Sequence, residues 1–402
     1  MVKKNEVETP AAAPPSNHAS LSDLTLLFLR LGLTAFGGPA AHIAMMEDEV
    51  VRRRRWLSRD KFLDLLGASN LIPGPSSTEL AIYIGYQQAG WMGLLLGGVC
   101  FVLPAAMMVA AIAWAYVRFG SLPATAAILY GIKPVVIAVI LQALWNLGRA
   151  AVKTKFLAII GLAAVTLNFL RVNELIVLFG TGLIVAAVKW TSSRPAAGRF
   201  RVFALYPAVP IATLLQTATA PGATEAAPVG LWPLFLFFLK IGSVLFGSGY
   251  VLLAFLRSDL VERWHWMTNS QLLDAVAVGQ VTPGPVFTTA TFIGYVLGGP
   301  PGAIVATIGI FLPSFILVAI SGPLIPRIRR SPTAGAFLDG VTVASLALMV
   351  VVTFVLGRTA LVDPLTIGLV VTSAILIIRF RVNSAWLVLG GAIVGWLLSG
   401  RV

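Results

Sequence analysis

The chain has 402 residues, of which 58% are hydrophobic and only 11% are charged, and its formal net charge is +13. Because soluble domains carry about 25% charged residues, this composition excludes an ordinary soluble protein and indicates a lipid bilayer as the surroundings. The positive charge does not indicate a nucleic-acid partner, since the basic residues lie mainly between apolar segments, where they orient a membrane protein. The single cysteine, Cys100, excludes a disulfide framework and a multi-cysteine metal site.

The predicted elements begin with a polar N-terminal tail. Residues 1–21 are rich in proline and alanine and lack the apolar core and cleavage site of a secretory signal, so we expect them to be disordered. Apolar runs follow, and a helix needs about 20 such residues to cross roughly 30 Å of hydrocarbon. Examples are Trp91 to Val117, Ala124 to Leu147 and Leu338 to Leu356. No segment alternates with a period of two, as a transmembrane barrel would, so the predicted fold class is an all-α polytopic membrane protein.

The two halves of the chain repeat one another. The stretch FLRLGLTAFGG begins at Phe28, and the stretch FLKIGSVLFGS begins at Phe238. Nearly the same register continues through the chain, which is typical of a duplicated structural unit. Matched positions along it are Trp56 and Trp266, Asp64 and Asp274, Gly85 and Gly294, Pro104 and Pro313, and Arg149 and Arg358. We predict a first unit at residues 22–190, a connector at 191–228 and a second unit at 229–402.

The distribution of lysine and arginine predicts opposite orientations for the two units. Basic residues concentrate in loops on the cytoplasmic side. In the first unit most of them, such as Lys153 and Lys189, lie in loops on one side, whereas in the second unit most, such as Arg329 and Arg379, lie in loops equivalent to the other side. We therefore predict inverted repeats. Such a pair needs an odd number of crossings between equivalent points, so the connector adds a span if each unit crosses an even number of times.

A Pro-Gly-Pro triplet interrupts an apolar run in each unit. Proline lacks a backbone donor and drives the residue before it out of helical conformation, so each run must split into two half-helices. Irregular backbone at membrane depth is tolerated only where it is buried in protein or lines a cavity. Paired interruptions in inverted repeats indicate the substrate site of a transporter. The substrate-binding candidates at the two breaks are Pro73, Gly74, Pro75, Ser76, Ser77 and Thr78, and Pro283, Gly284, Pro285, Thr288 and Thr289.

The residues after the first triplet are suited to an anion. Ser76, Ser77 and Thr78 would present hydroxyl and unpaired N–H groups at the positive end of a half-helix, which binds tetrahedral oxyanions readily. The alternative is an ordinary N-cap without a ligand, because serine and threonine are preferred there. The second unit is less polar, since Val286 and Phe287 stand where the first unit has its two serines.

Two cations occupy equivalent positions in long apolar runs, Arg30 in the first unit and Lys240 in the second. A cation at the centre of a membrane helix costs about 2.5 to 3.5 kcal/mol on insertion scales, so its presence needs a reason. We predict that both are counter-charges for an anionic substrate, and the alternative is that they extend to the membrane interface. Lys133 is a weaker third candidate, because Thr342 replaces it in the second unit.

The candidate acids for proton coupling are Glu79, Asp64 and Asp274, because a carboxyl group in a low-dielectric site can keep its proton near neutral pH. Glu79 near a helix N-terminus is equally a partner of the helix dipole. The two aspartates each follow a residue typical of a helix N-cap, which favours a structural role. His42 is interpreted as a packed polar residue.

Three glycines complete the candidates for the substrate site, Gly37 and Gly38 near the start of the first unit and Gly247 near the start of the second. Small residues allow close approach of helices, which is a packing role. The alternative is that the AFGGP stretch unwinds the first helix near the substrate site.

Together these features resemble the long-chain chromate ion transporters, a family built from two homologous halves of opposite topology. The resemblance covers about residues 22–400 and rests on the repeated F-[LI]-x-[LI]-G-x-x-x-F-G opening, the Pro-Gly-Pro triplets and the IGY motif after each. It implies a multi-pass antiporter of the bacterial inner membrane that exports chromate from the cytoplasm, driven by the proton or electrochemical gradient, with sulfate as an analogue. The family motif positions Phe36, Gly37, Gly38 and Pro39 are present, but the second unit lacks the proline.

Other function classes are weighed on the absence or presence of motifs. An enzyme and an ATP-driven pump are disfavoured, because the chain has no HExxH motif, nucleophile elbow or Walker loop, and we expect no metal and no cofactor. A passive oxyanion channel and a sulfate-type uptake transporter are the alternatives, since broken helices and cations serve channels too. The expected partners are the oxyanion and the lipid bilayer. The sequence leaves open the coupling ion and the oligomeric state, with a homodimer as one alternative.

Overall fold

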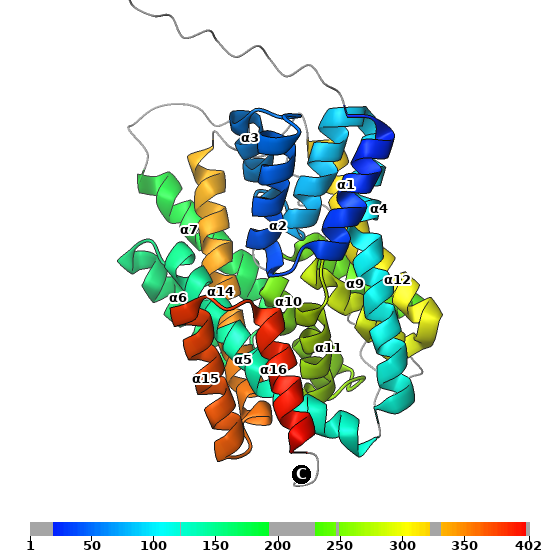
Figure 1. Ribbon diagram of the computed structural model, residues 1–402. Coiled ribbons are helices and arrows are strands. Elements are labelled where there is room, and N and C mark those ends of the chain that lie inside the picture. The colour runs from blue at the N-terminus through cyan, green and yellow to red at the C-terminus, as the bar shows by residue number, and fades with distance from the viewer. Residues whose placement is uncertain (1–18, 121, 193–229, 247–248, 322–330, 399–402) are drawn as a thin grey trace, which may run out of the picture.

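The computed structural model describes residues 19–120, 122–192, 230–246, 249–321 and 331–398. Within these ranges the chain forms helices joined by short loops, and it contains no strand (Figure 1). Most of the predicted tail, nearly all of the predicted connector with its extra span, and Gly247 lie outside the described residues.

The helices of the two halves follow one another in the same order. The first half contains α1 (Leu21–Thr34), α2 (Gly38–Glu47), the π-helical segment η1 (Asp48–Arg53), α3 (Arg59–Ser69), α4 (Ser76–Phe119), α5 (Pro123–Ala151), α6 (Lys155–Phe169) and α7 (Glu174–Ser192). The second half contains α9 (Leu231–Val244), η3 (Gly249–Val251), α10 (Leu252–Leu256), the π-helical segment η4 (Arg257–Arg263), α11 (Asn269–Val281), η5 (Val286–Thr288), α12 (Thr289–Ser321), α14 (Pro332–Ala360), α15 (Pro364–Phe380) and α16 (Ser384–Leu397). Two equivalent pairs also agree in length, because α1 and α9 both have 14 residues and α5 and α14 both have 29.

Both Pro-Gly-Pro triplets interrupt the helices, as predicted. In the first half α3 ends at Ser69 and α4 begins at Ser76, and in the second half α11 ends at Val281 and η5 begins at Val286. The helices before the triplets begin at capping residues, as expected for a serine or threonine that accepts a backbone hydrogen bond. The half-helices on either side of each triplet are therefore separate elements.

A second interruption, which the sequence analysis did not predict, folds α4 and α12 into hairpins. In α4 the backbone turns at Ala89 and Gly90, where Gly90 has a φ of 57° that favours glycine. The two arms then run antiparallel in close contact, because a Cβ on Gly85 would lie only 2.0 Å from the carbonyl oxygen of Gly93. The α12 hairpin repeats this arrangement, with its turn at Gly298 and Gly299.

Five segments of the described chain are long and apolar enough to cross a membrane. They are Ser76–Phe119, Pro123–Ala151, Glu174–Thr191, Val286–Ser321 and Pro332–Ala360. Large apolar side chains such as Trp114, Ile159 and Trp386 are exposed on the outer helices, as expected for a surface that faces lipid. These features confirm the predicted all-α polytopic membrane protein.

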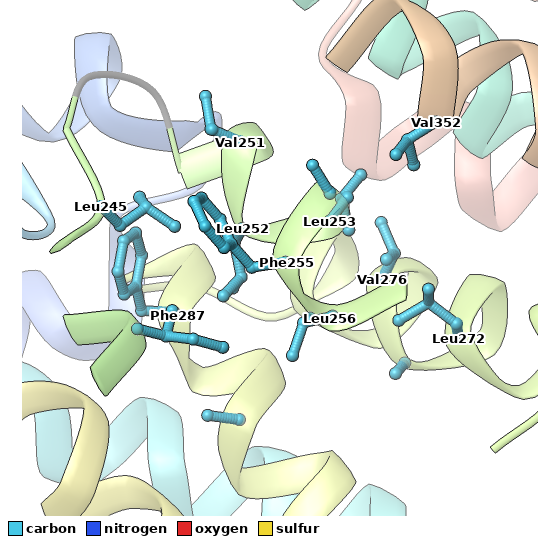
Figure 2. Close-up of a cluster of buried hydrophobic side chains, with 14 of the residues drawn as sticks. Leu245, Val251, Leu252, Leu253, Phe255, Leu256, Leu272, Val276, Phe287 and Val352 are labelled. Atoms are coloured by element: carbon cyan, nitrogen blue, oxygen red, sulfur yellow. The ribbon is translucent and has the colours of Figure 1, made fainter. Parts of the chain in front are cut away.

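The largest buried apolar cluster contains residues of both halves, and part of it surrounds α10 (Figure 2). Side chains of α10 pack there between Leu272 and Val276 of α11, Val352 of α14 and Phe287 of η5. The corresponding helix of the first half, α2, contributes Met46 to a smaller cluster with α1 and the first arm of α4. All five residues of α10 are buried, whereas in α2 only His42 and Met46 are.

Candidate functional site

The two triplets meet at the centre of the molecule through a reciprocal pair of backbone hydrogen bonds. The N–H of Gly74 donates to the carbonyl of Leu245, 2.8 Å away, and the N–H of Gly284 donates to the carbonyl of Ala35, 2.9 Å away. Ala35 and Leu245 are the equivalent residues that follow α1 and α9. Each triplet is thus bonded to the break between the first helices of the other half, and the breaks of both halves form one central region.

Glycine is required in the middle of each triplet. Gly74 and Gly284 have φ values of 138° and 87°, in the region that other residues rarely adopt. A Cβ on Gly74 would also lie 2.1 Å from Oε1 of Glu79 and 2.7 Å from Oγ of Ser314, and a Cβ on Gly284 would lie 2.6 Å from the Cβ of Ala105. The triplets therefore pack against the long arms of the α4 and α12 hairpins of the opposite half.

The first break holds buried polar atoms that lack partners. Pro75, the N-cap of α4, supplies no side-chain hydrogen bond, and its carbonyl accepts from the N–H groups of Thr78 and Glu79. Among the described residues, the N–H groups of Ser76 and Ser77 have no backbone acceptor. Oγ1 of Thr78 and Oε2 of Glu79 are fully buried and have no hydrogen-bond partner in the described chain. Unpaired polar atoms are costly in a protein interior, so this cluster is the candidate binding site.

The second break satisfies its own threonine hydroxyls. Oγ1 of Thr288 donates to the carbonyl of Pro285, and Oγ1 of Thr289 donates to the carbonyl of Val286, both at 2.8 Å. The space that follows the triplet is filled by Phe287, which is almost completely buried. The two breaks therefore share a backbone framework but differ in chemistry.

His42 of α2 lies beside the first break. Its Nε2 is 3.0 Å from the carbonyl oxygen of Ala35, and its Nδ1 is 3.3 Å from Oγ of Ser77. The ring packs edge-on against Phe101, with 5.6 Å between the ring centroids. The interpretation of His42 as a packed polar residue describes its burial but misses this contact. A comparison of the two halves could have indicated it, because Leu252 occupies the equivalent position in the second half.

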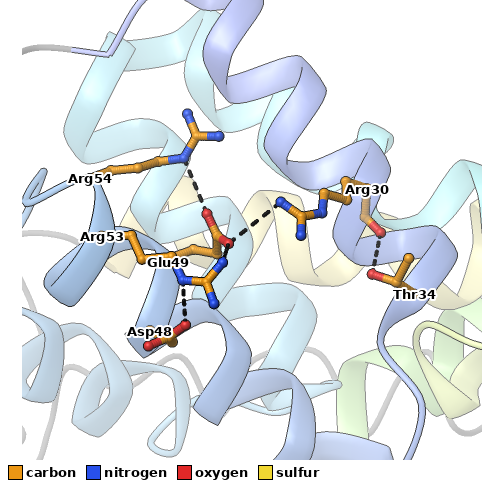
Figure 3. Close-up of polar contacts among 6 residues, drawn as sticks. All are labelled: Arg30, Thr34, Asp48, Glu49, Arg53 and Arg54. Atoms are coloured by element: carbon orange, nitrogen blue, oxygen red, sulfur yellow. Dashed lines mark hydrogen bonds and ion pairs between the residues drawn. The ribbon is translucent and has the colours of Figure 1, made fainter.

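Arg30 is paired with a carboxylate of its own half (Figure 3). Its Nη1 lies 3.6 Å from Oε1 of Glu49 in η1, and Glu49 also pairs with Arg53 at 3.1 Å and with Arg54 at 3.3 Å. The Arg30 side chain is 60% exposed and borders a cavity of 290 Å³ between α1, α2 and η1, which we call the α1 cavity. Arg30 makes no hydrogen bond or ion pair with the triplets among the described residues.

Lys240 repeats this arrangement in the second half. Its Nζ lies 2.9 Å from Oδ2 of Asp259 in η4, and Arg263 lies 3.8 Å from the other carboxylate oxygen. Asp259 is the equivalent of Glu49, and the sequence analysis singled out neither acid. The role of Arg30 and Lys240 as counter-charges for a substrate stays a prediction, and their partners in the structure are these two carboxylates.

The equivalent aspartates differ in surroundings. Asp274 of α11 is buried, lies 3.3 Å from Nζ of Lys133 and accepts a hydrogen bond of 3.0 Å from the hydroxyl of Tyr116. Lys133 also donates to Oγ of Ser270, at 2.6 Å. Asp64 of α3 is exposed. The contacts of Asp274 join the second half to α4 and α5 of the first half.

The glycines near the first break lie where α1 ends. Gly37 and Gly38 have φ values of 106° and 76°, and Pro39 occupies the first turn of α2. The AFGGP stretch, which begins at Ala35, thus separates α1 from α2.

A second cavity lies away from the triplets. It has a volume of 450 Å³ and is bordered by the loop between α6 and α7, by η4 and by α14. Its polar border includes Arg171, Arg257, Arg263, Glu174 and Glu262, and we call it the α14 cavity. Arg257 is already paired with Glu262 at 2.8 Å, so part of its charge is neutralised.

The fold and the central region define a class of protein: a helical membrane protein whose interrupted helices meet between two similar halves, as in secondary transporters. A sequence model of the family described as "Chromate transporter" matches residues 22–186 and again residues 232–396. The chain therefore belongs to the chromate transporter family. This membership makes it a multi-pass membrane transport protein and not an enzyme.

Curated relatives are similar over most of their length. The chain is 34% identical over 383 residues to the chromate transport protein of Cupriavidus metallidurans, covering 94% of this chain and 92% of that protein. It is 35% identical over 347 residues to the probable chromate transport protein of Synechococcus elongatus, covering 86% of each. It is 32% identical over 408 residues to the chromate transport protein of Pseudomonas aeruginosa, covering 98% of this chain and 96% of that protein. No solved structure matches the chain.

Proposed function

We propose that this chain is a secondary transporter that exports chromate, or a sulfate-like oxyanion, across the bacterial inner membrane, and that the anion binds at the N-terminus of α4. The names of the curated relatives support chromate as the substrate. The observation that carries the site is the group of unpaired polar atoms at the first break: the N–H groups of Ser76 and Ser77, and the buried Oγ1 of Thr78 and Oε2 of Glu79. The proposed units are residues 22–190 and 229–402, inverted relative to one another and joined by the connector at 191–228.

The inverted arrangement is supported by the positions of the equivalent helices. In Figure 1 α1, α2 and α3 lie toward one end of the molecule, and α9, α10 and α11 lie below them toward the other end. The reciprocal bonds of Gly74 and Gly284 lie between the two groups. Broken helices that enter from opposite sides would place the anion site near the middle of the membrane.

The chemistry at the first break matches a tetrahedral dianion. Such an anion only accepts hydrogen bonds, and the N-terminus of α4 offers two free N–H groups and the hydroxyl of Thr78. A carboxylate at Glu79 would repel the anion, whereas a protonated Glu79 can donate from Oε2. Glu79 is therefore the first of the proposed proton-coupling groups, with Asp274 and Asp64 as the others.

The membrane potential supplies a driving force for export. Moving one elementary charge through 100 mV is worth about 2.3 kcal/mol, so a potential that is negative inside expels an anion. A dianion that leaves together with one proton keeps a net charge of −1 and is still expelled. The resemblance favours antiport with protons, whereas a proton on Glu79 favours movement of the proton with the anion. The direction of proton movement is thus part of the test.

The test is a flux assay with purified protein in liposomes. Chromate and sulfate fluxes are measured while the membrane potential and the pH gradient are imposed separately, and proton movement is recorded at the same time. We expect anion flux to follow the potential and to be coupled to protons. Flux that is insensitive to the pH gradient and moves no proton would identify a passive channel and contradict the proposal.

Thr78→Val is the variant that tests the site. A hydrogen bond to a charged group contributes about 1.5 to 3 kcal/mol, so loss of the hydroxyl should weaken oxyanion binding by about 10- to 100-fold. Without a ligand the substitution removes an unsatisfied polar atom, so the stability of the empty protein should stay the same or rise. Thr289→Val is the control, because that hydroxyl is already satisfied by the carbonyl of Val286. Equal affinities for both variants and the wild type would place the anion elsewhere.

A further inference from the structure

The contact between His42 and Ser77 has a defined hydrogen-bond direction. A carbonyl oxygen can only accept, so the Nε2 that lies 3.0 Å from Ala35 must carry a hydrogen. In the neutral ring Nδ1 then has none, and it accepts from the hydroxyl of Ser77 at 3.3 Å. The only hydrogen of that hydroxyl is thus directed at His42 and is not available to an anion at the N-terminus of α4.

Protonation of His42 reverses this bond. With a hydrogen on both ring nitrogens, Nδ1 donates to Oγ of Ser77, and the serine hydroxyl hydrogen is released to point elsewhere. Ser77 is buried, and it directly precedes Thr78, whose own hydroxyl is unpaired. The first break then gains one more donor and one positive charge at the same moment. Both changes favour a doubly charged anion.

We propose that His42 is a proton-linked positioning residue that sets whether Ser77 donates its hydroxyl to the bound oxyanion. This inference rests on the proposed anion site at the N-terminus of α4. The balance is one proton taken up from solution at Nδ1 and one anion bound, with no covalent bond made or broken. Because coupling between two ligands is reciprocal, binding of the anion also increases the affinity of His42 for its proton.

The second half supplies a natural comparison. Leu252, Phe287 and Leu245 occupy the positions of His42, Ser77 and Ala35, and they lie together in the apolar cluster of Figure 2. The carbonyl of Leu245 accepts there from the N–H of Gly74, and a leucine stands at the position equivalent to His42. The fold of a break therefore does not require the histidine and serine pair, which supports a role in binding.

The charged groups on the elements packed against α2 do not provide another partner for His42 in the structure. The hydrogen bonds of the ring run only to Ala35 and Ser77 among the described residues. On α1 and η1, Arg30, Asp48, Glu49 and Arg53 form ion pairs with one another, Asp23 accepts from the hydroxyl of Ser20, and Arg52 is exposed. On α4 the acid nearest to Ser77 along the chain is Glu79, which accepts from the hydroxyl of Ser314. A proton on Glu79 and a proton on His42 act in the same direction, since both add donors to the site.

The test compares the wild type with His42→Gln. Glutamine can donate to Ala35 but does not titrate, so it imitates the neutral histidine. Chromate affinity is measured from pH 5 to pH 8, and the ratio of the wild-type affinity to the variant affinity is taken at each pH, so that protonation of chromate itself cancels. We expect the ratio to be near one at the alkaline end and to rise as the pH falls, by up to about tenfold per pH unit for one linked proton.

Two further variants separate this role from a structural one. In a protein that already carries Ser77→Ala, the affinity ratio should rise less at low pH than it does in the wild type. In that background His42→Gln should also reduce the chromate affinity less than it does in the wild type. His265→Gln removes an exposed histidine far along the chain and should keep the full pH dependence. Each purified variant is checked for a single peak in size-exclusion chromatography.

The possible results distinguish the inference from the proposed function. A ratio that stays constant with pH, while the wild type binds chromate and sulfate, overturns the role of His42 and leaves the anion site intact. Absence of chromate and sulfate binding by the wild type at every pH overturns the proposed function itself, and the inference with it.

Discussion

The two Pro-Gly-Pro breaks share the same backbone hydrogen bonds, but polar side chains surround the first break and apolar side chains surround the second. Each central glycine donates to a carbonyl of the other half, at 2.8 Å and 2.9 Å. In the first half His42 and Ser77 surround that framework, whereas Leu252 and Phe287 do so in the second. The comparison teaches that one backbone framework can hold broken helices with polar side chains around it in one half and apolar side chains around it in the other.

The largest effect is expected when the first break is made to resemble the second. His42→Leu combined with Ser77→Ala removes the polar pair and should reduce chromate transport by about 10- to 100-fold at the acidic end of the pH range, since the hydroxyl that protonated His42 releases to the anion is lost. The protein should still fold, because the second break is built in this way. Transport by purified protein in liposomes is the measurement, and wild-type rates in the double variant would show that the polar difference is unrelated to transport.

The next effect concerns what the breaks share. Gly74→Ala should displace Glu79 and Ser314, because the new Cβ would lie 2.1 Å from the carboxyl oxygen, and the φ of 138° is unfavourable for alanine. Backbone strain of this kind costs about 1 to 3 kcal/mol, so both the unfolding temperature and transport should fall. Gly368→Ala on α15 is the matched control, since its Cβ would meet nothing within 4 Å. An unchanged unfolding temperature for Gly74→Ala would contradict the close packing at the triplet.

A smaller effect should separate the equivalent aspartates. Asp274→Asn breaks the buried contact with Lys133 and weakens that with Tyr116, and should lower the free energy of unfolding by about 1 to 3 kcal/mol. Asp64→Asn lies on an exposed face and should change it by about 0.5 kcal/mol or less. Denaturant unfolding in detergent measures both, and equal losses would contradict the asymmetry between α3 and α11.

The smallest effect concerns the caps of two equivalent helices. Thr154 caps α6, and Asp363 caps α15 and accepts a hydrogen bond from the hydroxyl of Tyr130. That hydroxyl, followed by the backbone N–H of Thr366, lowers the pKa of Asp363 below its usual value of 3.8. A lowered pKa contributes stability that is present above the pKa of the unfolded chain and is lost as the pH falls through the folded value.

The unfolding temperature of the wild type should therefore decrease more steeply below about pH 4 than that of Asp363→Asn. Thr154→Ser should keep the wild-type slope, because its cap does not titrate. Parallel pH profiles for the wild type and Asp363→Asn would contradict the proposed contribution of this cap.

Much of the framework could be predicted from the sequence. Apolar runs and missing charge were enough for the polytopic helical fold, and the donor lost at each proline was enough for the interruptions at both triplets. The turns at Ala89 and Gly298 were not predicted, because a turn between two antiparallel arms depends on glycine contacts such as that between Gly85 and Gly93, which lie within a single apolar run.

The candidate site was only partly accessible from the sequence. Ser77 and Thr78 were selected from the positive end of a half-helix, which is a local property. The partners of Arg30 and Lys240 were not predicted, because Glu49 and Asp259 lie in strongly charged stretches that resemble loops and come close only when α1 packs against η1 and α9 against η4. His42 needed the fold as well, since its contact with Ser77 joins residues that are far apart in the chain.

The central claim is that the anion binds where the two breaks meet, at the N-terminus of α4. Anomalous diffraction at the chromium absorption edge, from crystals grown with chromate, locates the chromium atom directly. We predict one dominant peak within hydrogen-bonding range of the Ser77 and Thr78 hydroxyls, reduced in Thr78→Val crystals. A dominant peak in the α1 cavity beside Arg30 or in the α14 cavity beside Arg257, with none at α4, would contradict the account.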